Sequence, residues 1–427
     1  MTFKDSGYYR ILCSLVASLM SMSLIFASAK GHDKNVPAGS AADSIRISLI
    51  TCYPGPAIYA LDGHEAIRVK TADTDSVWNY GIFDFSGKGF VYRFVKGETD
   101  YRLAGYPFAW FMPEYVQRGS TVVEQDLNLT AEQAQKLRSM LQREGLPQNC
   151  VYRYNYLKDN CATRILDRLD SLTPGKVVYP QETRFETWRD AMKHFHRNYP
   201  WYQFGIDLAL GGGLDTEMNS RQEMFVPMLM MEKVRGAHFP DGRPLVTGER
   251  VLFQGGDATL PPTPWYAGPL FWSIIVLVAT LIFAVVSLWQ KRLYRWPYAI
   301  FFGLLGITGC LSAFLVFVSV HEATAPNLLV LWLNPLQLVF PLFIWSRRTR
   351  PLCQAMAIVD SLVLLTLLTL WPLQNQVANP AFFPLIGATL IMSATYAINS
   401  LSPSYKDGRP QKTPPAKAAR KKVSRRK

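Results

Sequence analysis

The distribution of apolar and polar residues divides the chain near Pro264. Before this residue, short apolar runs alternate with polar and turn-forming residues, whereas five long apolar stretches follow it. Each stretch is close to the roughly 20 residues that a helix needs to cross the hydrocarbon of a bilayer. The predicted spans are residues 265–289, 297–320, 328–345, 354–371 and 381–398. We therefore expect an all-α membrane bundle of about five helices over residues 265–400.

The loops between these predicted spans alternate in charge. Lys and Arg residues lie in the first loop (positions 291, 292 and 295) and the third (347, 348 and 350), and none lie in the second and fourth. Positively charged loops stay in the cytoplasm. We therefore predict a multi-pass inner-membrane protein with the preceding domain in the periplasm and a basic cytoplasmic tail over residues 401–427. Asp360, inside a predicted span, is either a functional group or a carboxyl that pairs with a neighbouring helix.

The pattern before the bundle is typical of an α+β domain. Five short runs of β-branched and aromatic residues, bounded by Gly, Pro or Asp, predict strands at 45–51, 66–70, 77–85, 90–94 and 122–128. Thr130 begins a capping signature for a helix that runs to about Glu144, and a second helix begins near Cys161. We assign the exported domain to residues 44–245, between linkers at 30–43 and 246–264.

Residues 1–29 have the layout of a secretory signal peptide. Lys4 and Arg10 precede an apolar stretch over residues 11–26, and Ala27-Ser28-Ala29 supplies a small-x-small cleavage site. The apolar stretch is long for a signal peptide, so an uncleaved anchor helix is the alternative. Both interpretations place the following domain outside the cytoplasm.

The basic net charge does not indicate nucleic-acid binding. The formal net charge is +13, but residues 405–427 hold ten Lys and Arg residues against one acid. The rest of the chain is only mildly basic, and it has no zinc-finger spacing, helix-turn-helix signature or basic-aromatic platform. We expect no nucleic-acid partner, no metal and no cofactor.

The exported half holds three cysteines: Cys52, Cys150 and Cys161. An odd number in an oxidising compartment leaves at least one thiol unpaired, or paired between chains. Asp159 and Asn160 precede Cys161 as a helix cap, which predicts that its thiol lies in the first helical turn, where free amides and the helix dipole favour a thiolate. A Cys52–Cys150 disulfide would leave Cys161 free; otherwise Cys52 lies close to the site or in the core.

A nucleophilic thiol needs a base, and His64 is the leading candidate. It lies just where a Gly-opened segment enters a predicted strand, and Asn79 follows on a neighbouring strand. Asn79 can hydrogen-bond the far ring nitrogen of His64 and fix its tautomer. The predicted catalytic residues are therefore Cys161, His64 and Asn79, with a structural histidine as the alternative. His194 and His196 are weaker candidates, because residues 192–199 resemble a solvated helix end.

Several longer motifs of the exported half resemble a known family. They are residues 49–55 (LITCYPG), 63–68 (GHEAIR), 79–85 (NYGIFDF), 152–156 (YRYNY), 159–164 (DNCATR), 205–211 (GIDLALG) and 225–227 (FVP). Together with the signal segment and the multi-span region, they resemble the Bacteroidota lipoprotein N-acyltransferases of the Lnb type. The order of His64 before Asn160-Cys161 at a helix start is also similar to permuted papain-like thiol enzymes such as lecithin:retinol acyltransferase.

This resemblance implies a Cys-His acyltransferase. It would move an acyl chain from a phospholipid to the α-amine of the lipidated N-terminal cysteine of a diacyl lipoprotein, through a thioester on Cys161. The backbone amide of Cys161, together with Asn160 or Tyr80, could support the oxyanion. Residues 106–112 could form an apolar lip toward the acyl chain, or belong to the core. The candidate phosphate ligands are Arg93, Arg118, Arg164 and Arg184, each of them alternatively a surface or packing residue.

Two other functions stay open on the sequence. A thiol peptidase or amidase acting on peptidoglycan would use the same residues with water as the acceptor. A non-catalytic envelope scaffold would have Cys161 in a disulfide. The large membrane region favours acyl transfer, because both proposed substrates carry their reactive groups at the outer surface of the inner membrane.

Overall fold

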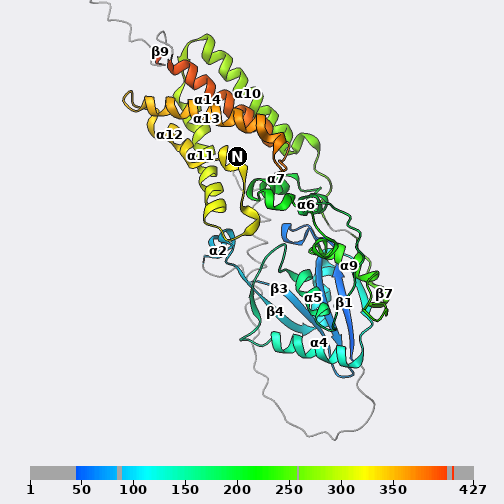
Figure 1. Cartoon of the computed structure of the whole chain (residues 1–427). Coiled ribbons are helices and arrows are strands. Elements are labelled where there is room, and N and C mark those ends of the chain that lie inside the picture. The colour runs from blue at the N-terminus through cyan, green and yellow to red at the C-terminus, as the bar shows by residue number, and fades with distance from the viewer. Residues whose placement is uncertain (1–44, 84–88, 257–258, 402–405, 408–427) are drawn as a thin grey trace, which may run out of the picture. The chain divides into compact units, whose positions relative to one another are not determined.

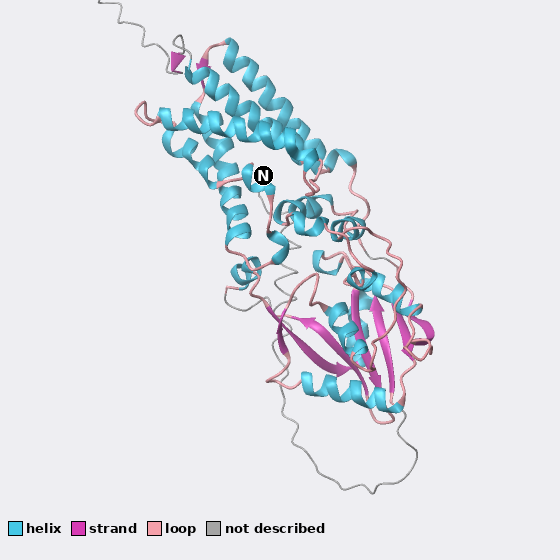
Figure 2. Ribbon diagram, viewed as in Figure 1, coloured by secondary structure: helices cyan, strands magenta, loops and turns pink. Residues whose placement is uncertain are grey.

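The computed structural model describes residues 45–83, 89–256, 259–401 and 406–407 (Figure 1). The predicted signal segment, the first linker and most of the predicted basic tail lie outside the described residues. From Ser44 onward the chain forms one compact unit. This unit contains a sheet with helices packed on it, followed by long apolar helices (Figure 2).

The exported domain is built on a seven-stranded antiparallel sheet with the order β6-β4-β3-β2-β1-β5-β7. Most residues of its central strands are buried, and β-branched and aliphatic side chains make up about half of them. The strands are β1 (Arg46–Cys52), β2 (His64–Lys70), β3 (Asp75–Ile82), β4 (Asp100–Pro107), β5 (Val122–Leu127), β6 (Val151–Arg153) and β7 (Val246–Phe253).

Helices cover both faces of this sheet. On one face Leu49 and Ile67 pack with α4 (Ala131–Glu144) and α5 (Cys161–Asp170). On the other face Cys52 and Ala66 pack with α3 (Phe108–Arg118). Neighbouring residues of a strand point to opposite faces. Consecutive side chains of β2 therefore meet different helices.

Most of the predicted elements are present. The runs at 45–51, 66–70, 77–85 and 122–128 form β1, β2, β3 and β5. The capping signature is confirmed, because the Thr130 side chain and Gln133 cap α4 reciprocally. The remaining helices of the domain are α6 (Trp188–Phe195), α7 (Pro200–Ala209), α8 (Ser220–Glu223) and α9 (Pro227–Arg235).

Two predicted segments differ from the structure. The run at 90–94 forms a helix, α2 (Phe90–Lys96), instead of a strand. Its apolar residues suit a helical face as well as a strand, and Gly89 and Gly97, both with positive φ, bound it. The predicted linker at 246–264 begins with β7, which completes the sheet by pairing with β5. An edge strand has few buried residues, so its hydrophobic signal is weak.

The membrane region has four helices that are long and apolar enough to cross a bilayer. They are α10 (Pro269–Trp289), α11 (Arg295–Phe317), α13 (Arg350–Leu370) and α14 (Phe382–Leu401). The predicted third span is present as a shorter apolar helical segment, Leu328–Phe343, which is interrupted inside. It consists of η5 (Leu328–Leu331), η6 (Pro335–Leu338) and α12 (Val339–Phe343). Pro335 lacks a backbone N–H, and the Asn334 side chain accepts from Leu336 N to start a new turn, so the helix is interrupted there.

One end of this bundle brings two chain segments together. The short strand β8 (Arg292–Leu293), between α10 and α11, pairs with β9 (Lys406–Asp407), which follows α14. The first basic loop and the start of the tail therefore lie at the same end of the bundle.

Candidate active site

Cys161 is the first residue of α5, and its thiol is free. The expected cap is present: the side-chain oxygen of Asn160 accepts from Ala162 N at 2.9 Å and Thr163 N at 3.0 Å. Apolar residues of α5 pack on the sheet and hold the helix start against β2. The thiol contacts the backbone N–H groups of Glu65 and Ala162.

The thiol lies where β2 and β3 separate. The β2–β3 ladder ends at the pair Ile67–Trp78, so Glu65 lies beyond the paired region. On the β3 side Gly81 has φ 92°, and a Cβ atom there would lie 3.9 Å from the Cβ of Cys161. A glycine at this position therefore leaves the space beside Cys161 open and allows the backbone to turn away. Cys161 occupies the opening between the two strands.

His64 and Asn79 bridge the same two strands. His64 Nε2 lies 2.6 Å from Asn79 Oδ1, and Asn79 Nδ2 donates to Tyr106 Oη at 2.9 Å. Because the amide nitrogen donates to Tyr106, the amide oxygen accepts from Nε2–H and leaves a lone pair on Nδ1. The expected His64–Asn79 hydrogen bond is therefore present. Within the described residues, no hydrogen bond joins the thiol to the imidazole, and the catalytic role of the three residues stays a prediction.

Burial controls the protonation of the thiol and the imidazole. Burial raises the pKa of Cys161 to about 11, although backbone amides partly lower it. Burial also lowers the pKa of His64, although the bond to Asn79 opposes this. Both groups are therefore neutral at pH 7. The expectation of a resting thiolate is wrong, because desolvation outweighs the helix start. The thiol needs a base before it can attack.

Glu65 is a buried carboxyl on the same face of the sheet as α5. Its Oε2 accepts from Thr51 Oγ1 at 2.8 Å, and its Oε1 has no hydrogen-bond partner among the described residues. Burial raises the pKa of Glu65 to about 8. Most of this carboxyl is therefore protonated at pH 7. Only its position next to His64 could have drawn attention to it from the sequence.

A second buried polar group lies near the thiol. Asp62 accepts a short hydrogen bond from Tyr156 Oη, and its other oxygen lies 3.7 Å from His196 Nε2. His196 Nδ1 lies 2.8 Å from Gln203 Oε1, and His196 is only 1% exposed. The expected solvated helix end is therefore wrong at His196, because the chain turns inward directly after α6. His194 lies at the surface, 3.5 Å from Arg184.

The two predicted side-chain donors for the oxyanion, Asn160 and Tyr80, already donate to other groups. Asn160 Nδ2 donates to the carbonyl oxygens of Tyr156 and Phe225, both at 2.8 Å. Tyr80 Oη donates to Glu144 at 2.7 Å. Neither side chain has a free donor to aim at a carbonyl held by Cys161. These two residues position α5 and the sheet, and the backbone N–H groups beside the thiol are the nearest donors.

The predicted phosphate ligands differ in whether their guanidinium groups are already bonded to other residues of the domain. Arg118 donates to Ser120 Oγ at 2.8 Å and to the Tyr53 carbonyl at 3.2 Å. Arg164 donates to Asp159 at 2.8 Å and stacks over the Tyr152 ring at 3.6 Å. Both guanidinium groups therefore hold the local fold. Arg93 lies exposed on α2.

The residues of the expected apolar lip are divided between core and surface. Phe111 is buried in the cluster on the α3 face, Phe108 lies under Arg68 at 3.6 Å, and Tyr106 belongs to the His64–Asn79 chain. Trp110 is 73% exposed. Of residues 106–112, one is buried, three are partly buried and three are exposed, so the segment forms an edge of the domain.

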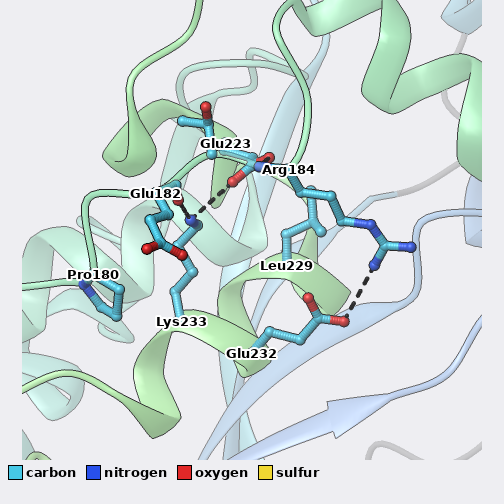
Figure 3. Close-up of a pocket in the computed structure, with 8 residues that line it drawn as sticks. Pro180, Glu182, Arg184, Glu223, Leu229, Glu232 and Lys233 are labelled. Carbon is cyan, nitrogen blue, oxygen red and sulfur yellow. Dashed lines mark hydrogen bonds and ion pairs between the residues drawn. The ribbon is translucent and has the colours of Figure 1, made fainter.

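A surface pocket elsewhere in the domain is lined by charges that neutralise each other (Figure 3). Arg184 pairs with Glu232 at 3.5 Å, and Lys233 pairs with Glu223 at 3.0 Å. The lining residues are Pro180, Glu182, Thr183, Arg184, Glu223, Leu229, Glu232 and Lys233. None of the predicted catalytic residues lines this pocket, and its paired charges do not suit an acyl chain.

The described cysteines are all free, so the possible Cys52–Cys150 disulfide is absent. Cys52 ends β1, whereas Cys150 precedes β6, and three strands lie between β1 and β6. At about 4.8 Å per strand spacing, the two residues are roughly 19 Å apart, which is far beyond the reach of a disulfide. Cys161 is likewise in no disulfide with another described cysteine, which the scaffold alternative had expected of it.

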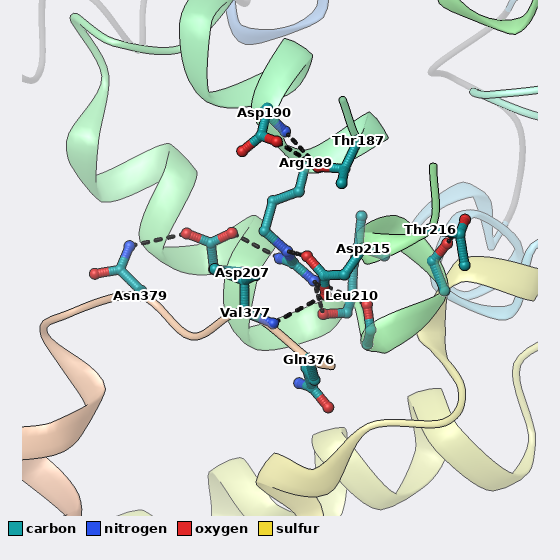
Figure 4. A network of polar contacts seen from close by, with 12 residues as sticks. Thr187, Arg189, Asp190, Asp207, Leu210, Asp215, Thr216, Gln376, Val377 and Asn379 are labelled. Carbon is teal, nitrogen blue, oxygen red and sulfur yellow. Dashed lines mark hydrogen bonds and ion pairs between the residues drawn. The ribbon is translucent and has the colours of Figure 1, made fainter. Parts of the chain in front are cut away.

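A buried charge cluster joins the exported domain to the membrane region (Figure 4). Arg189 of α6 donates to Asp207 of α7 and to Asp215, each at 2.7 Å. Asn379, in the segment before α14, donates to Asp207 at 2.9 Å, and Val377 N donates to Asp215 at 3.1 Å. The charges therefore pair with one another inside the exported domain, and two neutral donors of the membrane region bond to its carboxylates. Nothing in the local sequence pattern indicated the cluster.

In the described residues, no group of three or more His, Cys, Asp or Glu side chains is arranged to hold a metal ion. The functional groups at the site are therefore a thiol, an imidazole, an amide and a neutral carboxyl.

This fold and site define a membrane-anchored protein whose α+β domain carries a partly buried free cysteine at a helix start. Two protein-family models match the chain: residues 33–194 match the Lnb N-terminal periplasmic domain, and residues 262–403 match the Lnb transmembrane domain. The chain therefore belongs to the Lnb family and is an inner-membrane protein with a periplasmic N-terminal domain. Comparison with curated proteins and with solved structures found no match.

Proposed function

We propose that this protein is a thiol acyltransferase that N-acylates lipoproteins. The acyl donor is a membrane phospholipid, and the acceptor is the α-amine of the lipidated N-terminal cysteine of a diacyl lipoprotein. The observation that carries the proposal is the free thiol of Cys161 in the opening bridged by the His64–Asn79 hydrogen bond. The Lnb-type domains support a role in lipoprotein N-acylation.

In the first half-reaction the sulfur of Cys161 attacks the ester carbonyl of the phospholipid. His64 Nδ1 takes the thiol proton, because its neutral imidazole has the lone pair there. The sulfur–carbon bond forms, the ester carbon–oxygen bond breaks, and the imidazolium returns the proton to the departing lysophospholipid oxygen. The acyl group is then held as a thioester.

In the second half-reaction the lipoprotein amine attacks this thioester. His64 takes a proton from the amine nitrogen, the carbon–nitrogen bond forms, and the carbon–sulfur bond breaks. The imidazolium then returns its proton to the sulfur of Cys161, so the enzyme regains its starting state. The backbone N–H groups of Glu65 and Cys161 are the proposed oxyanion donors in both steps.

A permuted papain-like arrangement and a cytoplasmic C-terminus belong to this proposal. The His-bearing strand β2 precedes the Cys-bearing helix α5, which packs on the sheet, and this supports the papain-like arrangement. The β8–β9 pairing supports a cytoplasmic tail, because it holds the tail beside the first basic loop.

Cysteine replacement tests the function directly. Cys161→Ala and Cys161→Ser should stop the conversion of diacyl to triacyl lipoprotein, measured by mass spectrometry of lipoproteins from cells that depend on this protein. Cys150→Ser is the matched control, because Cys150 precedes β6 and lies away from the opening between β2 and β3. Normal conversion by either Cys161 variant would defeat the proposal.

A second measurement separates acyl transfer from hydrolysis. Full-length protein given a radiolabelled phospholipid should form a hydroxylamine-sensitive acyl adduct that is absent from Cys161→Ala. Addition of a diacyl lipopeptide should move the label to its amine. Release of free fatty acid without an acylated amine would instead indicate the hydrolase alternative.

A further inference from the structure

The helix α2 exposes apolar side chains at the surface of the domain. Val91 is 73% exposed, Tyr92 58% and Phe94 50%, and none of the helix residues is buried. Three large exposed apolar residues in a seven-residue helix are costly in water. Arg93, between them in sequence, is exposed as well. The helix therefore presents apolar groups together with a cation.

The position of α2 relative to the membrane follows from its contacts with α11. Val320 N donates to the Lys96 carbonyl at 2.8 Å, and Ser319 Oγ donates to the Val95 carbonyl at 2.9 Å. The ring of Tyr92 lies 6.0 Å from that of Phe314, in the last turn of α11. Because this end of the apolar span meets the periplasmic domain, α2 lies beside the periplasmic end of α11. Its apolar side chains are therefore within reach of lipid.

A continuous series of aromatic rings leads from α2 toward Cys161. Phe94 stacks with Phe90 at 5.9 Å, and Phe90 stacks with Phe83 at 6.1 Å. Phe83 packs on Tyr101 at 4.7 Å, and Tyr101 stacks on Tyr154 at 4.1 Å.

The inner end of this series lies beside the thiol. Tyr154 and Cys161 pack against the same apolar cluster. Burial raises the pKa of Tyr154 well above its ordinary value, and the charge of a Cys161 thiolate raises it further. The series thus leads from α2 to the apolar cluster against which the proposed nucleophile packs.

We infer that α2 and this aromatic series form the entry site for a glycerophospholipid of the outer leaflet. Its acyl chain lies along Phe94, Phe90 and Phe83, and Arg93 binds its phosphate. The apolar wall lets the ester approach Cys161 without the chain crossing water. This inference rests on the proposed acyl transfer and identifies where the donor binds.

Photo-crosslinking tests the site without relying on catalysis. Full-length Cys161→Ala is reconstituted in vesicles of phosphatidylethanolamine and phosphatidylglycerol that contain a phospholipid with a diazirine in its acyl chain. The expected result is crosslinked peptide from residues 89–96 and from Phe83 or Tyr101, decreasing when unlabelled phospholipid is added in excess. Crosslinks confined to the membrane-spanning helices would overturn the inference.

A pair of variants tests the role of the site in turnover. Val91→Asp with Phe94→Ser should lower transfer from a long-chain phospholipid by about tenfold, while turnover of a water-soluble butyryl thioester stays unchanged. Val116→Asp, on the exposed face of α3, is the control for an added surface charge. Equal losses with both substrates, or no loss with either, would overturn the entry site.

The two proposals fail in different ways in these experiments. If acyl transfer itself is wrong, wild-type protein gives no Cys161-dependent turnover of either substrate, while the crosslinks report on lipid binding alone. If only the entry site is wrong, turnover depends on Cys161 but does not respond to the α2 variant.

Discussion

The Arg189 cluster and the surroundings of Cys161 both bury carboxyl groups, but they treat them differently. Asp207 and Asp215 are at most 1% exposed, and each is bonded to Arg189. Around Cys161, three buried oxygen atoms lack a hydrogen-bond partner among the described residues. They belong to Asp62 (Oδ1), Glu65 (Oε1) and Tyr152 (Oη). The buried carboxylates of the Arg189 cluster therefore have bonded partners, whereas these three oxygen atoms around Cys161 do not.

This difference separates a structural site from a reactive one. A paired buried charge is stable only while its partner remains, and it gives the contact between two segments a defined geometry. An unpaired buried polar group costs stability, so such groups collect where a substrate or a reaction step can use them. Glu65 is largely neutral at pH 7 because burial disfavours its charged form and raises its pKa to about 8. We therefore expect substitution of Arg189 to lower the free energy of unfolding, and substitution of Glu65 to change how stability depends on pH.

Loss of the arginine should have the largest effect on stability. Arg189→Met leaves two buried carboxylates without their cation, and we expect a loss of about 3–5 kcal/mol in the free energy of unfolding. Thermal or chemical unfolding of the full-length protein in detergent measures this. Arg184→Met is the matched control, because Arg184 and Glu232 are about half exposed and such a pair contributes about 0–1 kcal/mol. Equal losses in both variants would remove the contrast between the two sites.

Removal of the Glu65 carboxyl should change how stability depends on pH. Folding raises the pKa of Glu65 from 4.5 to about 8, so between these values the folded state binds more protons than the unfolded state. The stability contribution of Glu65 is therefore fully present below pH 4.5 and is lost as pH rises through about 8. Glu65→Gln cannot titrate and should lose this dependence.

The measurement compares melting temperatures of the wild type and Glu65→Gln at pH 5 and pH 8.5. The wild type should lose more stability over this interval than the variant. Glu114→Gln, at an exposed position on α3, is the control for a carboxyl-to-amide change. Parallel curves for the wild type and Glu65→Gln would show that this carboxyl is not held neutral by the fold.

The sequence predicted the parts of the site that depend on local rules. Asn160 precedes an amphipathic run, so the cap and the position of Cys161 at the start of α5 followed from neighbouring residues. His64 and Asn79 were expected on adjacent strands because only one turn separates them. By contrast, Phe90–Lys96 is an apolar run between glycines, which fits either a strand or a helix. The third span was predicted as continuous because hydropathy averages hide the effect of Pro335.

The remaining features depend on residues far apart in the chain. Arg189 meets Asp207 and Asp215, 18 and 26 residues away, and all of them meet the segment before α14 only after folding. The shift in the pKa of Cys161 has the same origin. A helix start lowers the pKa of a thiol by a local effect, whereas the burial that dominates here comes from the whole packed domain.

The smallest expected effect concerns the tautomer of His64. Tyr106 Oη accepts from Asn79 Nδ2, so Tyr106→Phe removes the bond that holds the amide oxygen toward His64 Nε2. We expect a loss of about 1 kcal/mol in stability, as for one ordinary hydrogen bond. A positioning role predicts in addition that kcat falls severalfold while KM for the phospholipid stays unchanged. Without Tyr106 Oη the Asn79 amide can rotate, and the imidazole of His64 is then no longer held in the tautomer that has its lone pair on Nδ1.

Tyr101→Phe is the control: its ring belongs to the aromatic series, but it has no bond to Asn79. If kcat stays unchanged in Tyr106→Phe, whether or not KM changes, then the fold holds Asn79 in place without help from Tyr106.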